Sequence, residues 1–159
     1  MTPQEYNRAV EEFSDRIYRF ILKSMNETER ARDVVQDSYE KLWMNVNDIE
    51  YPKAKAWLFS TAYNGMIDIL RKEKRIISTE DDIDEPYEGG YSDLNEILHE
   101  CLNKLPDYWR SVILLRDYEG YSYKEISDIT GQSESQVKIN IYRGRMAMRK
   151  MIGKMEMVV

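Results

Sequence analysis

Apolar residues recur along this chain every three or four positions, as on one face of an α-helix, and no stretch shows sustained strand-like alternation. In the first half this spacing predicts helices over about 3–25, 26–46 and 52–75. In the second half it predicts a helix over about 92–118, broken at Leu105-Pro106, and then two helices on either side of Gly131. The sequence therefore predicts an all-α fold.

Local start and stop signals set the expected ends of these helices. Asn26, three residues before Glu29, is typical of a helix start, and Pro52 suits the first turn of the third helix. Gly120 and Gly131 suit the residue that follows a helix. The last two helices each begin with a capping box, Ser122-x-x-Glu125 and Ser133-x-x-Gln136.

The charges divide the chain into three parts. Residues 1–76 contain thirteen basic and thirteen acidic residues, and residues 94–159 contain ten and nine. Residues 77–93 contain seven acids and no base, which explains the net charge of −6. Repelling carboxylates, Pro86 and Gly89-Gly90 predict a flexible linker there. We expect two small helical domains, 1–76 and 94–159, that behave independently on either side of an acidic linker, 77–93.

The composition argues against several classes of protein. With a single cysteine, Cys101, and a single histidine, His99, the chain offers no internal disulfide and no basis for a metal or cofactor site. We find no nucleophile–base pair and no phosphate-binding loop that would indicate an enzyme. No apolar run approaches the length of a membrane span, and residues 1–5 lack the features of a signal peptide. We expect a cytoplasmic protein that needs no cofactor and does not insert into membranes.

Residues 122–145 have the pattern of a DNA-reading helix-turn-helix. Ser127 is the small residue expected where the helices cross, and Gly131 lies in the turn. Six basic residues and no acid lie between 138 and 154, which suits phosphates. An ordinary helical hairpin with a solvated basic face is the alternative. Residues predicted to pack inward are Ile126, Ile129, Val137, Ile141, Gly144 and Met148. Residues predicted to face DNA are Ser135, Gln136, Lys138, Ile139, Tyr142 and Arg143.

Two stripes of polar residues stand out in the first half. Asp33, Gln36, Asp37 and Glu40 lie at i, i+3, i+4 and i+7, opposite the apolar side of the second predicted helix. A solvated face is the usual explanation of such a stripe. On the third predicted helix, an aromatic residue shares one side with polar and basic residues, which suits unpaired bases, although such aromatics more often belong to a core. This second stripe contains Trp57, Ser60, Asn64, Asp68, Arg71 and Arg75.

Together these segments resemble a known family. Residues 31–43 and 56–72 look like domain two of bacterial sigma factors. Residues 105–116, followed by the helix-turn-helix, look like domain four. Two domains without an intervening third resemble the extracytoplasmic-function (ECF) group of the sigma-70 family. This resemblance implies a non-enzymatic factor that binds core RNA polymerase, melts promoters and directs transcription initiation, with an anti-sigma factor as a further partner.

The resemblance also implies a role for each stripe. The residues Asp33, Gln36, Asp37 and Glu40 would bind the clamp helices of core polymerase. The outward residues of the last helix would read the minus-thirty-five element in double-stranded DNA, and the acidic linker would run near the RNA path. The minus-ten element, including the melted non-template strand, would be read by Asn47, Asp48, Trp57, Asn64, Asp68 and Arg71.

Some positions depart from the family's usual pattern. Glu134, Ile139 and Asn140 replace residues that are often small, polar or basic, which changes the expected base contacts. Gly144 replaces the usual alanine, and we expect it to cost about 0.5–1 kcal/mol of helix stability.

Two other functions fit parts of the sequence. A one-component helix-turn-helix regulator would explain the C-terminal half but not the joint pattern of the second and third helices. An all-helical interaction protein that never meets DNA would leave the acid-free basic end unexplained.

Overall fold

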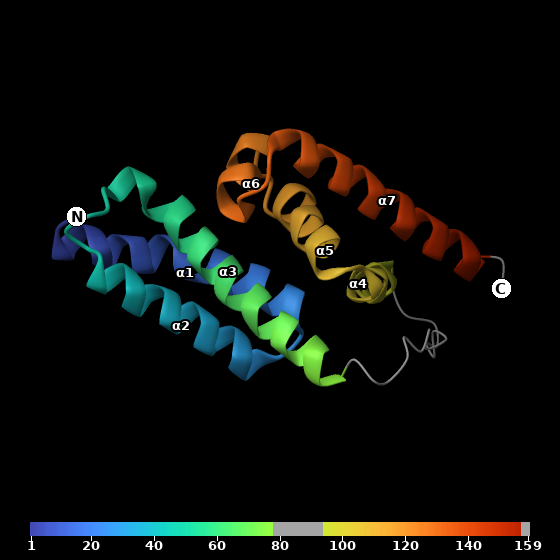
Figure 1. Cartoon of the computed structure of the whole chain (residues 1–159), viewed down its shortest axis with the longest axis horizontal. Helices are drawn as coiled ribbons and strands as arrows, with labels where there is room; N and C mark the ends of the chain where they lie inside the picture. Colours follow the sequence, from blue (N-terminus) through green and yellow to red (C-terminus); the bar gives the residue numbers. More distant parts are fainter. Residues whose placement is uncertain (78–93, 157–159) are drawn as a thin grey trace.

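The computed structural model describes residues 1–77 and 94–156, and every regular element in these two ranges is helical (Figure 1). The all-α prediction is therefore confirmed. The expected acidic linker lies almost entirely outside the described residues. The helices are α1 (Pro3–Met25), α2 (Thr28–Met44), α3 (Tyr51–Ile77), α4 (Leu94–Lys104), α5 (Asp107–Ile113), the π-helix η1 (Leu114–Tyr118), α6 (Tyr123–Thr130) and α7 (Glu134–Glu156).

Helices α1, α2 and α3 pack against one another to form the N-terminal half. A capping box fixes the start of α1: the Thr2 hydroxyl accepts a hydrogen bond from the Glu5 backbone N–H at 3.1 Å, and the Glu5 carboxylate accepts one from Thr2. The core between the three helices is apolar and fully buried, with Ile17, Leu42 and Leu58 all at 0% exposure. This bundle fixes which sides of α2 and α3 face outward.

The expected role of Asn26 was wrong. Asn26 has a left-handed backbone (φ 59°) and ends α1, and its N–H donates to the Leu22 carbonyl. Glu27 precedes α2 without any side-chain capping bond. Asparagine suits both ends of a helix because its short amide tolerates the left-handed region, so the sequence signal was real but its direction was misjudged.

Helices α5, α6 and α7 form the helix-turn-helix half, with α4 packed against α7. Both predicted capping boxes are present, at Ser122–Glu125 and Ser133–Gln136. Gly120 and Gly131 have φ of 74° and 77°, which favours glycine at these two turns. The predicted continuation to Tyr118 is correct in extent, but its last turn is the π-helix η1, which the apolar spacing did not reveal.

The inner side of α7 is as predicted. Val137 and Ile141 are buried, and they meet Ile126 and Ile129 of α6 in the same core. Gly144 is also buried, directly over α5: a Cβ added there would lie 2.5 Å from Ile113 Cδ1 and 3.4 Å from Trp109 Cβ. The glycine therefore allows α7 and α5 to approach closely, which its helix propensity alone did not indicate.

The two halves pack against each other, contrary to the expected independence. α3 packs along α6, and α1 contacts η1 and α5, so residues far apart in the sequence share one continuous core (Figure 1). At the junction Phe59 of α3 lies between Phe20 of α1 and Tyr121, which precedes α6, with ring centroids 6.1 and 5.2 Å away. An acidic, glycine-containing linker did not predict this because it says nothing about the surfaces on either side of it.

Candidate polymerase and nucleic-acid interfaces

The acidic stripe of α2 is present on the outer surface of the N-terminal half. Asp33, Gln36, Asp37 and Glu40 are all exposed, whereas Ala31, Val34, Ser38 and Leu42 on the other side of the helix are buried. Asp37 forms an ion pair with Lys41 at 2.9 Å, one helical turn away, and both side chains are about half exposed. Such a pair contributes little to stability, so the stripe remains available to a basic partner surface.

The polar stripe of α3 lies on one side of that helix, beside the C-terminal half. Asn64, Asp68 and Arg71 are exposed, whereas Trp57 is half-buried and packs partly against the core. Along the helix axis Trp57 and Arg71 are about 21 Å apart, at 1.5 Å per residue. The turn residues Asn47 and Asp48 are exposed just before α3 begins. The structure therefore brings Asn64, Asp68 and Arg71 together and leaves the other predicted minus-ten residues at the opposite end of the helix.

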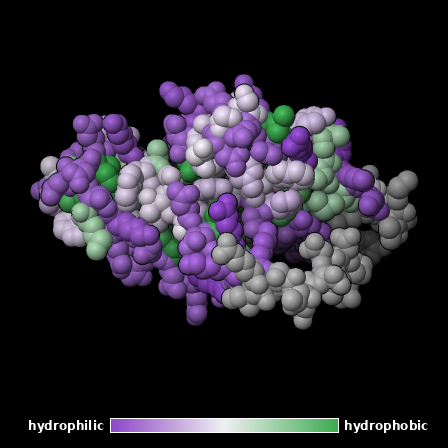
Figure 2. All heavy atoms as spheres, in the orientation of Figure 1, coloured by the Kyte–Doolittle hydropathy of each residue, from purple (hydrophilic) through white to green (hydrophobic). Residues whose placement is uncertain are grey.

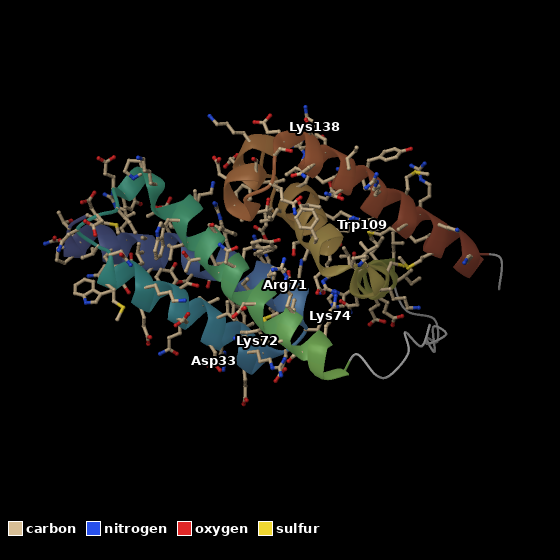
Figure 3. All side chains as sticks on the ribbon, in the orientation of Figure 1. Asp33, Arg71, Lys72, Lys74, Trp109 and Lys138 are labelled. Atoms are coloured by element: carbon tan, nitrogen blue, oxygen red, sulfur yellow. The ribbon has the colours of Figure 1, made fainter. Side chains whose placement is uncertain are left out.

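A pocket of about 470 Å³ separates this stripe from the C-terminal half. Asn64, Asp68 and Arg71 line one wall, and Tyr108 of α5 and Gln132 of the helix-turn-helix turn line the other. Arg71, Lys72 and Lys74 follow one another along the end of α3, and Lys74 reaches across to the second half (Figure 3). The α3 stripe is thus open to solvent on one side and confined by the C-terminal half on the other.

The outer side of α7 is open over most of its length. The predicted residues Ser135, Gln136, Lys138, Ile139, Tyr142 and Arg143 are all exposed. Lys138 Nζ lies 5.3 Å from the ring centre of Tyr123, and the guanidinium of Arg116 lies 4.3 Å from the same ring. These cation–π contacts hold two positive groups beside the first residue of α6. Nothing in the spacing of Tyr123 distinguishes it from other helix-surface tyrosines, so its contacts could not be predicted from the sequence.

Asn140, which departs from the family's pattern, does not belong to this outer surface. Its side-chain oxygen accepts a hydrogen bond from the indole Nε1–H of Trp109 at 3.0 Å. Asn140 therefore ties α7 to α5. Asp33 on α2 and Lys138 on α7 lie at opposite sides of the molecule, so the acidic and basic surfaces face away from each other (Figure 3).

Polar contacts between the halves form the part of the structure that sequence reasoning missed most completely. Arg19 of α1 donates two hydrogen bonds to Glu119, at 2.9 and 2.7 Å, and the Glu119 side chain is only 3% exposed. This hydrogen bond and the charge of Glu119 raise the pKa of Arg19. Burial at the junction raises the pKa of Tyr121 to about 12, so its phenol stays neutral against the Phe59 ring. Sequence spacing gives no signal for a pair of residues 100 positions apart.

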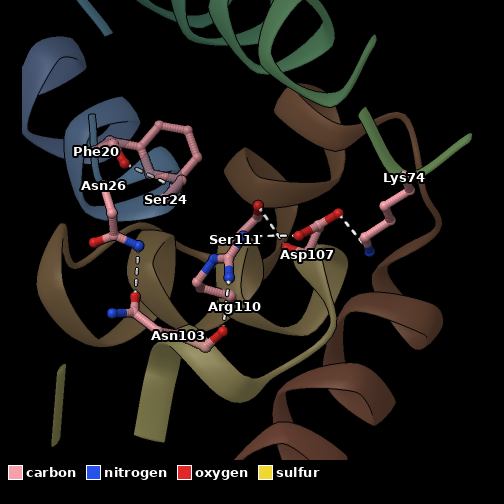
Figure 4. Close-up of polar contacts among 8 residues, drawn as sticks. All are labelled: Phe20, Ser24, Asn26, Lys74, Asn103, Asp107, Arg110 and Ser111. Atoms are coloured by element: carbon pink, nitrogen blue, oxygen red, sulfur yellow. Dashed lines mark hydrogen bonds and ion pairs between the residues drawn. The ribbon is translucent and has the colours of Figure 1, made fainter. Parts of the chain in front are cut away.

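Further contacts tie the two halves on either side of this pair. Asn26 donates to Asn103 at 2.7 Å, and Lys74 forms an ion pair with Asp107 at 2.8 Å (Figure 4). Lys55 of α3 reaches Glu125 of α6 at 3.4 Å. The Glu125 carboxyl has a lowered pKa, chiefly because it accepts the Ser122 backbone N–H and to a lesser extent because Lys55 is near.

The surface carries no large continuous apolar region on the side shown in Figure 2, where hydrophilic residues dominate. Among the described residues, no helix is long and apolar enough to cross a membrane. The same residues contain no group of three or more acidic, histidine or cysteine side chains arranged to hold a metal ion.

Comparison with known proteins gives one family for both halves. A family model for sigma-70 region 2 matches residues 9–76, and a model for sigma-70 region 4 matches residues 95–148. The RNA polymerase sigma factor SigV of Bacillus subtilis is 32% identical over 142 residues, covering 86% of this chain and 84% of that protein. The ECF RNA polymerase sigma factor SigM of the same bacterium is 27% identical over 145 residues, covering 87% and 89%.

Two solved structures share the fold. The sigma factor RpoE from Bartonella quintana, in complex with the anti-sigma factor NepR, superposes with a TM-score of 0.75 at 24% identity, covering 94% of this chain and 98% of that one. CnrH, in complex with the cytosolic domain of CnrY, superposes with a TM-score of 0.69 at 21% identity, covering 94% and 88%.

Proposed function

The chain belongs to the sigma-70 family and is an ECF sigma factor that directs transcription initiation, and we propose which of its surfaces bind polymerase and which bind the promoter. The observation that carries this proposal is the ordered match of regions 2 and 4 over the two halves. A one-component regulator would not need a region 2, so we set that alternative aside.

The α2 stripe is proposed to bind core RNA polymerase. Its four polar residues, Asp33, Gln36, Asp37 and Glu40, are exposed and face away from the C-terminal half, so the rest of the chain does not compete for them. Three of the four are carboxylates, which suits a basic docking surface on the polymerase clamp helices. Binding there would not require any change in the packing of α1, α2 and α3.

The α3 stripe and the turn before it are proposed to read the minus-ten element. Asn64, Asp68 and Arg71 offer exposed polar groups along one side of the helix, and Trp57 offers a partly exposed ring for stacking. Asn47 and Asp48, in the turn before α3, would meet the melted non-template strand. Arg71 supplies the positive charge that the phosphates of that strand require.

The outer side of α7 is proposed to enter the major groove at the minus-thirty-five element. In a helix-turn-helix the residues near the start of the second helix reach base edges. Here those residues are Ser135, Gln136 and Ile139, with Lys138, Tyr142 and Arg143 around them. The contacts of Lys138 and Arg116 with Tyr123 hold positive charge beside the same end of the helix, where the DNA backbone would run.

Both elements cannot be bound while the halves are packed as described. α3 packs on α6 and α6 packs on α7, and helices in contact have axes about 8–10 Å apart. The two promoter elements are about 25 base pairs apart, or roughly 85 Å at 3.4 Å per base pair. We therefore propose that the halves separate when polymerase and promoter bind. An anti-sigma factor would oppose this by holding the halves together, and the chain would act in the bacterial cytoplasm, where polymerase and DNA are found.

Transcription in vitro tests the proposed function. The full chain is mixed with core RNA polymerase and a pool of genomic promoter fragments, and transcripts are mapped. We expect discrete start sites that depend on the chain, and Asp37→Lys should lose them through weaker polymerase binding while its helicity is unchanged. Glu11→Lys reverses an exposed carboxylate on α1 and serves as the control. Equal loss with both variants, or no chain-dependent transcript, would contradict the proposal.

A further inference from the structure

Between Ile139 and Met146, the part of α7 that points straight away from the core is apolar. At about 100° per residue, Ile139 and Met146 lie roughly opposite the fully buried Val137. Ile139 is 50% exposed, Tyr142 beside it is 64% exposed, and Met146 is 44% exposed. Three of the seven large exposed hydrophobic residues among the described part of the chain therefore lie on this one helix surface.

Positive charge flanks this apolar strip. Lys138 and Arg143 are exposed on its two sides, and no acid occurs between residues 138 and 154. An apolar strip between cations is complementary to a surface that is itself apolar in the middle and anionic at the edges. The major groove of DNA, with phosphates on both rims, has this form wherever its floor carries a methyl group.

Two hydrogen-bonding side chains in the middle of α7 are turned away from this strip. Asn140, the only asparagine of α7, is bonded to Trp109 on the inner side. Arg145 forms an ion pair with Asp117 of η1. Ser135 and Gln136 remain exposed in the first turn of α7, and Ile139 is the side chain that would press on the floor of the groove from the second turn. Pressing it onto base donors and acceptors would strip them of water without replacing their hydrogen bonds.

We infer that Ile139 is a specificity-determining residue that contacts the C5-methyl group of a thymine in the minus-thirty-five element. Thymine is the only base that presents an apolar group in the major groove. Tyr142, one turn further, would close over the same methyl group and exclude water. The inference rests on the proposed entry of α7 into the major groove, and it names what that helix reads there.

Deoxyuridine substitution tests this contact because it removes the methyl group and keeps base pairing. Holoenzyme made from the full chain and core polymerase selects duplexes from a pool with a randomised upstream element. Each thymine of the enriched element, on either strand, is then replaced singly by deoxyuridine and the affinity is measured. We expect one replacement to weaken binding about fourfold, the effect of one buried methyl group.

Variants of the chain test whether Ile139 is the side chain that contacts this methyl group. Ile139→Ser, at a half-exposed position, should bind thymine and deoxyuridine duplexes equally, whereas Ile139→Val should keep most of the discrimination. Lys138→Ala should weaken both duplexes and leave their ratio at about fourfold, because it removes a contact to phosphate. Thermal unfolding of each variant checks that the fold is intact.

Several outcomes would overturn the inference. An enriched element without thymine, deoxyuridine tolerated at every position, or discrimination that persists in Ile139→Ser would exclude the contact while leaving the proposed function intact. A holoenzyme that transcribes but selects no upstream element would contradict both the contact and the proposed role of α7.

Discussion

Helices α3 and α7 both carry residues proposed to contact promoter DNA, but the two surfaces differ in how far the rest of the chain covers them. The outer side of α7 is exposed along six predicted contact residues. The stripe on α3 faces a pocket whose other wall is the C-terminal half, and Phe59 and Lys55 on the neighbouring side of α3 hold that half in place. Under the proposed assignments, the α7 surface is accessible in the packed chain, whereas the α3 surface would become fully accessible only after the halves separate.

A covalent link between the halves should produce the largest effect. Asn26 and Asn103 are exposed, and their side chains are 2.7 Å apart across the junction. Asn26→Cys with Asn103→Cys, in a Cys101→Ala background, can be joined by a short cleavable thiol cross-linker. We expect transcription from a chain-dependent promoter to fall about tenfold or more, because the competent open state is no longer populated. Cleaving the linker should restore it.

The single-cysteine chains treated with the same reagent are the controls for this experiment. They should transcribe as well as the untreated chains, since neither is linked. If the linked chain transcribed normally, the packed arrangement would be compatible with initiation and the contrast between α3 and α7 would have no functional meaning.

On the exposed side of α7, we expect Arg143 to contribute to sequence-specific binding and Lys138 to sequence-independent binding. Arg143→Ala should cost about 1–3 kcal/mol on the cognate upstream element and relax preference at one or two base pairs, because arginine is the common reader of guanine. Lys138→Ala should weaken all sequences alike and reduce the salt dependence by roughly one phosphate contact. The measurement is a holoenzyme titration against cognate and scrambled upstream duplexes at several salt concentrations. Equal losses on both duplexes for Arg143→Ala would make it a phosphate contact only.

Two acid–arginine ion pairs near η1 allow the contact between the halves to be tested apart from contacts within one half. Glu119 pairs with Arg19 of the other half, and Asp117 pairs with Arg145 of its own half. Glu119→Ala should weaken the packing of the halves by about 1–2 kcal/mol, a charged hydrogen bond discounted for the half-exposed Arg19. Asp117→Ala should leave it unchanged. Small-angle scattering of the free chains checks this: we expect a larger radius of gyration for Glu119→Ala alone.

The features predicted correctly from the sequence are those set by nearby residues. Capping boxes at Ser122 and Ser133, the turn at Gly131 and the apolar side of α7 depend on residues within a few positions of one another, and each is present. The acidic residues of α2 were predicted to face outward for the same reason, and they do. Local chemistry was therefore sufficient for the approximate extent of the helices and for which residues of α2 and α7 face solvent.

The features that were missed depend on partners far away in the chain. The contact of Arg19 with Glu119 and the packing of Phe59 on Tyr121 have no counterpart in any short pattern. Their formation depends on how two completed helical bundles fit together. The signal at Asn26 failed for a related reason, since the same residue suits a helix end and a helix start and only the following chain decides between them.

At Gly144 a local property, helix propensity, and a long-range one, packing against α5, predict opposite effects of the same substitution. This substitution has the smallest expected effect. Helix propensity alone predicts that Gly144→Ala stabilises the chain by about 0.5–1 kcal/mol. In the structure the added Cβ would meet Ile113, which is 2% exposed and has little room to move, and would also press on Trp109. Overpacking of this kind costs about 1–3 kcal/mol, so we expect a net loss of about 1 kcal/mol in the free energy of unfolding.

Gly153→Ala is the matched control, on the same helix but with no packing neighbour within 4 Å of the added Cβ. Without an overpacking cost, its helix propensity should stabilise the chain by a few tenths to about 1 kcal/mol. Urea unfolding of both variants, followed by circular dichroism, compares the two. The opposite signs are the essential result, because both substitutions change helix propensity alike and only one narrows the gap between α7 and α5. If Gly144→Ala were as stabilising as Gly153→Ala, Ile113 would have room to move aside, and the close approach of these helices would not depend on the glycine.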